Sequence, residues 1–475
     1  MKIERLDGIT PSEKYLKKLC DRAFLSLWSY SGIYRDQKQG KKGDGKEFCD
    51  LLVVFENHII IFSDKHIEFP NSGKIQLDWS RWYRRAVRDS ANQIFGAERW
   101  IRLFPNRLFI DRECKQLFPI EFPDLSKAIF HRIVIAHGVA ENCKKYFNGG
   151  TGSLFLDNNI LGDTHFQNNP QPFVIGQVNP DKGYIHVFDD TTLDIVLGKL
   201  DTVTDFVEYL SKKEKFFANS DFGVVAAGEE DLLAYYYQKL GVDDKHDFVL
   251  PDENLNFISL EEGFWEDFVQ SPQSKAQLEA DRVSYSWDAL IEIFNKNILE
   301  DTQHYAYPKG IGNQEKTVRF LARESRTQRR LLAKSLLELL ENTPEDKFAL
   351  RVAAPFADGD PYFIFMLFPH YEGLDQEEYR TLRRDVLYSY CLVVRLKFSD
   401  AKDIVGFATD SGIGVLRSED LIYYDGRNWS DEDKENAEYF SNEHGLLKTV
   451  REFRIREYEF PIKKLKKRKR HRTKK

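Results

Sequence analysis

Two short apolar runs constrain the fold of this chain more than any other feature. Leu51–Phe55 and Ile59–Phe62 flank the polar residues Glu56, Asn57 and His58. Short apolar runs that are separated by a tight turn are typical of two paired strands. Both runs are apolar at every position, so both faces of each strand must be covered. We therefore predict that residues 45–66 form an antiparallel hairpin in a mixed sheet with helices on both faces.

Two segments beside the hairpin have the pattern of the covering helices. Residues 10–30 begin with Thr10, Pro11 and Glu13, which suit a cap, a first helical turn and the positive end of a helix. Residues 79–103 are predicted to form a second long helix, which ends before Pro105.

The length of the chain, 475 residues, corresponds to roughly two to four domains. Residues 148–153 are rich in glycine and mark the first boundary. Strand and helix patterns alternate on both sides of it, which predicts the α/β class. The predicted parts are residues 1–150, a middle α/β region 151–310, a C-terminal α+β region 311–462 and a disordered basic tail 463–475.

Cysteine usage and hydropathy bear on the compartment. The five cysteines are widely spaced and form no CxxC motif, which disfavours a zinc ribbon and a disulfide framework. No stretch of about 18 apolar residues occurs, and acidic residues interrupt the N-terminus where a signal peptide needs an apolar run. These features predict a soluble, cytoplasmic protein with no membrane partner.

The charge is distributed unevenly along the chain. The net charge is −7, and residues 463–475 contain ten Lys or Arg and no acid. Residues 1–462 therefore carry −17. A basic tail on an acidic body seeks an anion. Nucleic acid is one candidate, and the alternative is a tail that solubilises the chain or docks on its own acidic body.

Four residues in the first part of the chain suggest a chemistry. Asp50 lies at the mouth of the first predicted strand, and Lys65 lies at the end of the second. A carboxylate that holds Mg²⁺ and a lysine that positions or deprotonates water are what metal-assisted phosphodiester hydrolysis needs. Glu13 on the first predicted helix and Gln93 on the next long helix belong to the same region.

In this order and context, Glu13, Asp50, Lys65 and Gln93 resemble the motif of the PD-(D/E)XK, or restriction-endonuclease-like, nuclease superfamily. The resemblance covers about residues 1–150 and implies an α/β/α nuclease core. It implies that Asp50 is a metal ligand and Lys65 the catalytic lysine, that Glu13 is an auxiliary ligand and that Gln93 orients substrate or water. The implied cofactor is Mg²⁺ or Mn²⁺.

One position departs from the family pattern. The second acid of the motif is expected at position 63, which is Ser63. Asp64 is adjacent but points away if the strand is regular, whereas a bulge would turn it toward the metal. Glu47 or Glu68 are alternative substitutes. If none of them serves, the chain binds without cutting.

Basic residues near this motif are candidates for contacts with a nucleic-acid backbone. Arg81, Arg84, Arg85 and Arg88 share the start of the second helix with Trp79, Trp82 and Tyr83. The alternative is that these arginines extend over buried aromatic rings. Lys466, Arg468 and Arg470 in the tail are further candidates.

Two other patterns have plainer interpretations. Basic residues recur every three or four positions from Lys316 to Lys334, which indicates a solvated or inter-domain helical face or a nucleic-acid track. His186 precedes Asp189 and Asp190, a set that could suggest a metal site, and we interpret them as a histidine at the end of a strand and acids in the turn.

These observations lead to two main hypotheses. The first is a metal-dependent nuclease that acts on nucleic acid, with DNA favoured, in a setting such as bacterial genome defence. The second is a catalytically inactive nuclease fold that binds nucleic acid, a protein partner or a second copy of the chain.

Overall fold

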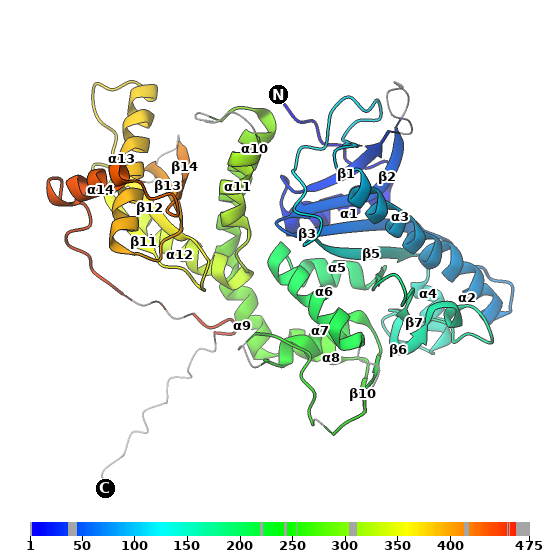
Figure 1. Cartoon of the computed structure of the whole chain (residues 1–475). Coiled ribbons are helices and arrows are strands. Elements are labelled where there is room, and N and C mark those ends of the chain that lie inside the picture. Colours follow the sequence, from blue (N-terminus) through cyan, green and yellow to red (C-terminus); the bar gives the residue numbers. More distant parts are fainter. Residues whose placement is uncertain are drawn as a thin grey trace, which may run out of the picture.

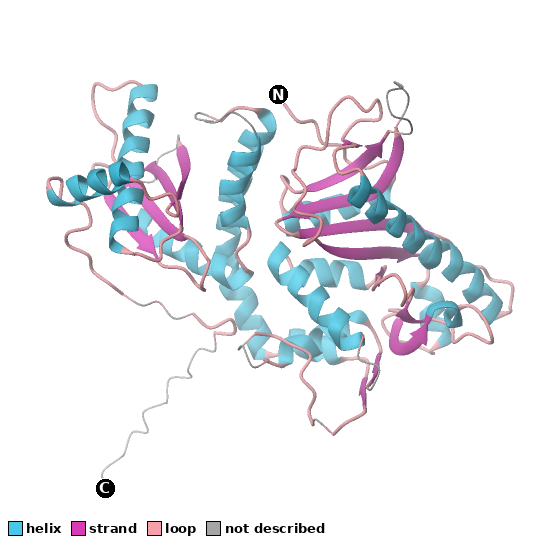
Figure 2. Ribbon diagram, viewed as in Figure 1, coloured by secondary structure: helices cyan, strands magenta, loops and turns pink. Residues whose placement is uncertain are grey.

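Figure 1 shows the computed structural model of the chain. It describes residues 2–36, 45–218, 222–241, 245–252, 254–303, 311–412, 418–453, 455 and 457–461. The predicted basic tail, with Lys466, Arg468 and Arg470, lies outside the described residues. The fold is mixed α/β, as predicted, and Figure 2 shows three separate sheets in the described part of the chain.

The first sheet contains the predicted hairpin. Its six strands have the order β4-β1-β2-β3-β5-β8. β1, β2 and β3 are antiparallel, whereas β3, β5 and β8 are parallel. The register pairs Leu51 with Phe62 and Phe55 with His58, which confirms the hairpin. The strands are β1 (Ser29–Arg35), β2 (Lys46–Phe55), β3 (His58–His66), β4 (Leu108–Phe109), β5 (Ile129–His137) and β8 (His186–Asp189).

Helices cover both faces of this sheet, because its central strands are apolar on both sides. α1 (Pro11–Phe24) covers one face, where the ring of Phe24 packs against Phe62 at 6.2 Å. α3 (Asp89–Leu103) covers the other face, where Glu98 pairs with Arg132 of β5 at 2.6 Å. The predicted arrangement of two flanking helices is therefore confirmed.

The boundaries of both predicted helices differ from the structure. The first helix ends at Phe24, because Leu25 has a φ of 65° and residues 29–35 form β1. The second is built from three segments, α2 (Ile75–Tyr83), a π-helix (Arg84–Arg88) and α3. A π-helical turn adds a residue to the helical repeat and often lies near a functional site.

The middle region contributes both to the first sheet and to a sheet of its own. β8 pairs with β5, so the first sheet extends past the boundary predicted at residue 150. α6 (Val203–Phe217) joins α1 on the same face, where Phe206 contacts Phe24 at 5.0 Å. The second sheet has the order β10-β9-β6-β7. The further elements are α4 (Ala140–Tyr146), β6 (Phe155–Leu161), a 3₁₀ helix (Gly162–His165), β7 (Val174–Gln177), α5 (Thr192–Lys199), β9 (Gly223–Ala226), α7 (Glu229–Gln238), β10 (Phe257–Leu260), α8 (Phe264–Gln270), α9 (Pro272–Asp281) and a 3₁₀ helix (Arg282–Ser284).

The third sheet forms the C-terminal unit, with strand order β11-β12-β13-β14. Alternate residues of β12 face two separate cores, one against α13 and one against α10. Trp287 of α10 contacts Phe363 and Phe365 of β12 edge-on. The elements are α10 (Tyr285–Glu300), α11 (Ile311–Ala322), α12 (Arg326–Glu341), β11 (Ala349–Ala353), β12 (Tyr362–Phe368), α13 (Gln376–Lys397), β13 (Asp403–Asp410), β14 (Glu419–Asp425) and α14 (Asp431–Asn442).

Two helices, α10 and α11, stand between the first and third sheets (Figure 1). Glu315 of α11 accepts a hydrogen bond from the indole N–H of Trp28 at 2.6 Å, which links α11 to the first unit. No helix in the described part of the chain is long and apolar enough to span a bilayer.

The basic run from Lys316 to Lys334 does not form one helical face. It is divided between α11 and α12, and Ser325 caps the second helix. Arg326, Arg329 and Arg330 are buried and pair with acids of other elements. This part of the run is therefore an internal ion-pair cluster.

Candidate active site

The strands β2 and β3 separate at the end that carries Asp50. Their ladder ends at the pair Leu51–Phe62, although β2 continues back to Lys46 and β3 continues to His66. The Asp50 carboxylate enters this fork, where its Oδ2 accepts a hydrogen bond from the backbone N–H of Asp64 at 2.5 Å. Asp50 is only 6% exposed. The fork therefore holds one buried carboxylate in a fixed orientation.

Three charged side chains act on Asp50: Glu47 of the same strand, Glu13 of α1 and Lys65 of β3. Burial, with smaller contributions from the charges of Glu47 and Glu13, raises the pKa of Asp50 to about 6. The Asp64 N–H and the Lys65 ammonium oppose this rise. Burial, with a contribution from Glu13, also raises the pKa of Glu47. The fold thus gathers Glu13, Glu47, Asp50 and Lys65 at one end of the sheet.

Local structure explains how Glu13 and Glu47 come to this end. Glu13 lies in the first turn of α1, where its carboxylate accepts from the backbone N–H of Ile9 at 2.7 Å. Glu47 lies next to a shift in the register between β1 and β2. Ile33 of β1 pairs with Cys49 of β2, whereas Tyr34 pairs with Glu47. The extra residue on β2 is a bulge, which changes the direction of a nearby side chain.

Asp64 faces away from Lys65. β3 stays in regular parallel register with β5 through Asp64, Lys65 and His66, so adjacent side chains alternate between faces. The Asp64 carboxylate accepts from Nε2 of His137 at 2.7 Å on the α1 side. The bulge that would turn Asp64 toward the metal is therefore not present in β3, and its predicted role as a metal ligand does not fit this geometry.

His137 is a residue that sequence reasoning missed. Its Nδ1 contacts Asp190 at 2.8 Å, so the ring lies between two carboxylates. Hydrogen bonds to Asp190 and Asp64 raise the pKa of His137 to about 9, although burial opposes the rise. A histidine that ends a strand parallel to β3, in register with the residues around Asp64, was the available signal.

Ser63 lies beside Asp50 at the position of the missing acid. It shares the Lys65 face of β3 by alternation. It is 1% exposed, and its hydroxyl has no hydrogen-bond partner among the described residues. A buried hydroxyl without a partner is unusual. The carboxylates of Asp50, Glu47 and Glu13 are the oxygen donors that Mg²⁺ prefers, and the Ser63 hydroxyl adds an unused polar atom. These donor types suit this ion, and the three carboxylates do not all lie within 4.8 Å of one another in the structure.

Gln93 lies on α3, the helix that covers the Lys65 face. It is half-buried and makes no hydrogen bond to Asp50 or Lys65 within the described part of the chain. The structure thus places the predicted glutamine on the expected helix and shows no direct link to the acids.

The basic residues before α3 lie on an aromatic cluster. Trp79, Trp82 and Tyr83 are fully buried, so these rings are part of the core. Arg84 and Arg88 stack over the ring of Phe166 at 4.7 and 5.0 Å. These contacts agree with the alternative that the arginines extend over buried aromatic rings. Arg81, Arg84 and Arg85 are exposed, whereas Arg88 is half-buried.

We expect Asp50→Asn to stabilise the fold at neutral pH. The pKa of Asp50 in the folded chain, about 6, lies above its ordinary value of 3.8. The folded state therefore holds the proton more tightly, and stability falls as the pH rises from about 4 to about 6. Removing the charge should add roughly 1–3 kcal/mol to the unfolding free energy at pH 7.5. Urea denaturation at pH 7.5 and pH 4 checks this.

Most of the gain should be lost at pH 4, where the carboxyl is protonated in the folded state and partly protonated in the unfolded state. Glu68→Gln is the matched control, because Glu68 is an exposed acid just beyond β3 and should change stability little at either pH. A variant Asp50→Asn that is less stable than the wild type at pH 7.5 would contradict the buried, repelled carboxylate.

Comparison of the chain with protein-family models, with curated proteins and with solved structures finds no match. The candidate site therefore depends on its own geometry and chemistry.

Proposed function

We propose that the chain is a Mg²⁺-dependent nuclease of the PD-(D/E)XK type that hydrolyses phosphodiester bonds, with DNA as the favoured substrate. The observation that carries this proposal is the buried Asp50 carboxylate in the strand fork. Two further carboxylates raise its pKa and the Lys65 ammonium opposes them. A bound divalent cation would offset the repulsion between these carboxylates. Residues with perturbed pKa values are often found at functional sites.

The residues have separate roles in this proposal. Asp50, Glu47 and Glu13 hold the cation, which supplies charge for the phosphate oxygens and a more acidic bound water. The hydrogen bond from the Asp64 N–H fixes the Asp50 carboxylate. Lys65 aligns the attacking water and offsets the negative charge that develops on the phosphate. The exposed Arg81, Arg84 and Arg85 contact the nucleic-acid backbone and orient it.

A second candidate function is binding without cleavage. Ser63 stands where an acid is expected, and Asp64 is engaged by His137 rather than by the fork. With fewer charged ligands than the motif provides, the fork would hold a cation weakly. In this case the chain binds nucleic acid or a protein partner through the same surface.

A cleavage assay separates the two functions. The purified full chain is incubated with single- and double-stranded DNA and RNA, with Mg²⁺, with Mn²⁺ and with chelator. Cutting that requires a metal supports the nuclease. Cutting that persists with chelator contradicts a metal mechanism, whereas retention of nucleic acid without cutting supports the binding function.

We expect deletion of residues 463–475 to weaken nucleic-acid binding and to flatten its dependence on salt. The segment carries ten Lys or Arg, and each phosphate contact on duplex DNA adds about 0.9 to the log–log salt slope. The slope should therefore fall by several units. Fluorescence anisotropy with duplex DNA over a range of salt concentrations measures it.

The melting temperature of the truncated chain serves as the control and should be unchanged. A salt slope that is the same with and without the segment would show that these cations act elsewhere, for example on the acidic body of the chain.

The setting of this activity is also a proposal. Four of the five cysteines are buried and all five are unpaired, which suits a reducing compartment such as the cytoplasm. Bacterial genome defence is the role that the nuclease resemblance implies.

A further inference from the structure

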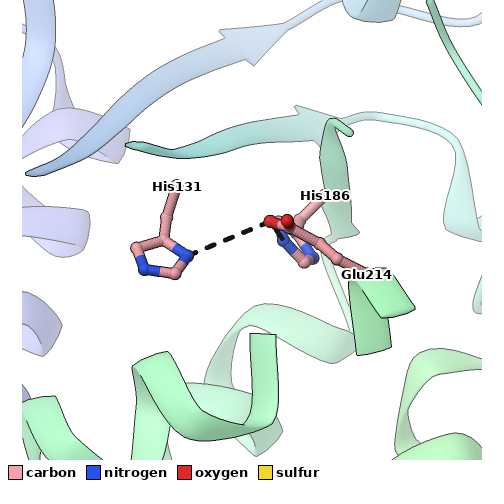
Figure 3. Close-up of side chains that lie close together, drawn as sticks. All are labelled: His131, His186 and Glu214. Atoms are coloured by element: carbon pink, nitrogen blue, oxygen red, sulfur yellow. Dashed lines mark hydrogen bonds and ion pairs between the residues drawn. The ribbon is translucent and has the colours of Figure 1, made fainter. Parts of the chain in front are cut away.

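A second cluster of possible metal ligands lies at the opposite end of the first sheet. His131 lies near the start of β5, and His186 begins the parallel strand β8. Ile133 pairs with His186, so alternation places both histidines on one face of the sheet. Glu214 reaches this face from α6. Figure 3 shows the two rings and the carboxylate converging on one point.

The distances within this cluster suit a small cation. Oε1 of Glu214 lies 3.0 Å from Nε2 of His186 and 4.0 Å from Nδ1 of His131. The candidate ligand atoms all lie within 4.8 Å of one another. Zinc–nitrogen and zinc–oxygen bonds of about 2.0–2.2 Å in a tetrahedral site separate the ligand atoms by about 3.4 Å. The observed distances lie on either side of that value.

His58 is hydrogen-bonded to the other nitrogen of the His131 ring. Its Nδ1 lies 2.9 Å from Nε2 of His131, and the two rings are stacked. When Nε2 of His131 carries the hydrogen and donates to His58, Nδ1 of His131 presents a lone pair toward the Glu214 carboxylate. Metal-bound histidines typically donate their other ring hydrogen to a neighbour in this way.

That lone pair has no partner of its own. His131 is fully buried, and its Nδ1 makes no hydrogen bond among the described residues. Leaving such an atom unsatisfied destabilises the folded chain. A cation between Nδ1 and the carboxylate removes this cost.

Neighbouring cations do not exclude a metal, because each has its own acid. Lys213 pairs with Glu229, and Arg132 pairs with Glu98. The two histidine side chains have no exposed surface, whereas the Glu214 side chain is 29% exposed. An ion can therefore enter from the Glu214 side.

We propose that His131, His186 and Glu214 form a zinc site that ties α6 to β5 and β8. Two imidazoles and one carboxylate favour Zn²⁺ over Mg²⁺, which prefers oxygen ligands alone. A water molecule fills the fourth position. The site is separate from the Asp50 fork, because the two clusters lie at opposite ends of the parallel strands.

Zinc binding to the full chain tests the proposal. Wild type, Glu214→Gln, His131→Gln and Glu208→Gln are stripped with chelator, reloaded with Zn²⁺ in excess Mg²⁺ and desalted. Elemental analysis then counts zinc per chain. We expect one more zinc per chain in the wild type than in Glu214→Gln or His131→Gln. Both variants should bind zinc at least tenfold more weakly than the wild type. Of these three proteins, only the wild type should show a higher melting temperature when zinc is added.

Glu208→Gln is the matched control, since Glu208 lies on the same helix and pairs with Lys212 at 3.0 Å. It should bind zinc like the wild type, and so should Asp50→Asn, which separates this site from the fork. Equal zinc content in the wild type and both ligand variants would overturn the proposal.

If the ligand variants do not fold, cobalt decides the question in the wild type. Co²⁺ bound by nitrogen and oxygen ligands in a tetrahedral site gives strong visible absorption bands. Bands that saturate at one equivalent and disappear on zinc addition support the site, and their absence overturns it.

Discussion

Asp50→Asn and Lys65→Ala are each expected to abolish metal-dependent cleavage while the chain remains folded. Asp50→Asn keeps the shape of the side chain and its acceptor for the Asp64 N–H, but removes the charge that holds the cation. Lys65→Ala removes the cation that aligns water and offsets charge on the phosphate. One such electrostatic contact changes the rate by about 10²–10³-fold. Single-turnover cleavage of a labelled duplex in Mg²⁺ measures the loss.

Two neighbouring acids provide the controls for this pair. Glu68→Gln changes an exposed acid beyond the strand and should retain full activity. Asp64→Asn should lower stability, because it removes the negative charge that faces His137, and should leave the cleavage rate of the folded chain close to the wild type. A rate lost with Asp64→Asn at unchanged stability would show that Asp64 turns toward the cation during the reaction. Cutting that survives both Asp50→Asn and Lys65→Ala would defeat the mechanism.

Arg326→Met should destabilise the fold strongly. The Arg326 guanidinium is buried between elements that are distant in sequence, where it donates to Asp201 at 2.8 Å and to Asp288 at 2.7 Å. Removing the cation leaves the nearly buried Asp201 without its charged partner. Loss of one member of a buried pair typically costs about 3–5 kcal/mol. Urea denaturation, followed by intrinsic tryptophan fluorescence, measures the change.

Arg282→Met is the matched control, because Arg282 pairs with Glu279 on the surface, where both side chains are mostly exposed. Such pairs contribute about 0–1 kcal/mol. An equal effect of the two substitutions would show that the Arg326 cluster contributes no more than a surface pair.

The sequence predicted the parts of the fold that depend on local pattern. Continuous apolar runs and a tight turn were enough to place β2 and β3 and to require helices on both faces. Apolar spacing could not end the first helix correctly, because Leu25, Leu27 and Trp28 continue the apolar pattern past the last turn. Nor could it place β8 beside β5, since parallel pairing joins strands that are far apart in sequence.

In the candidate site, too, the sequence predicted what depends on local pattern and missed what depends on the pairing of distant segments. Alternation along a strand predicted that Asp64 would face away from Lys65, and the structure confirms this for a regular β3. The bulge that brings in Glu47 lies on β2 instead, and it depends on pairing with β1, a strand that the sequence did not suggest. The cluster of His131, His186 and Glu214 draws on two strands and a helix, so no spacing in the sequence marks it.

The last described residues of the chain are hydrogen-bonded to residues far from them in sequence, although none of them is buried, and this limits where the basic segment can act. Arg330 donates to the carbonyl of Tyr458 at 2.7 Å, and Glu459 accepts from His246 and Gln277, each at 2.8 Å. The 14 residues after Pro461 extend at most about 50 Å. A nucleic-acid strand bound by these residues would have an effective concentration on the order of millimolar near Pro461. Nucleic acid bound by the segment would therefore stay within a few nanometres of the rest of the protein, so that it meets the candidate site more often.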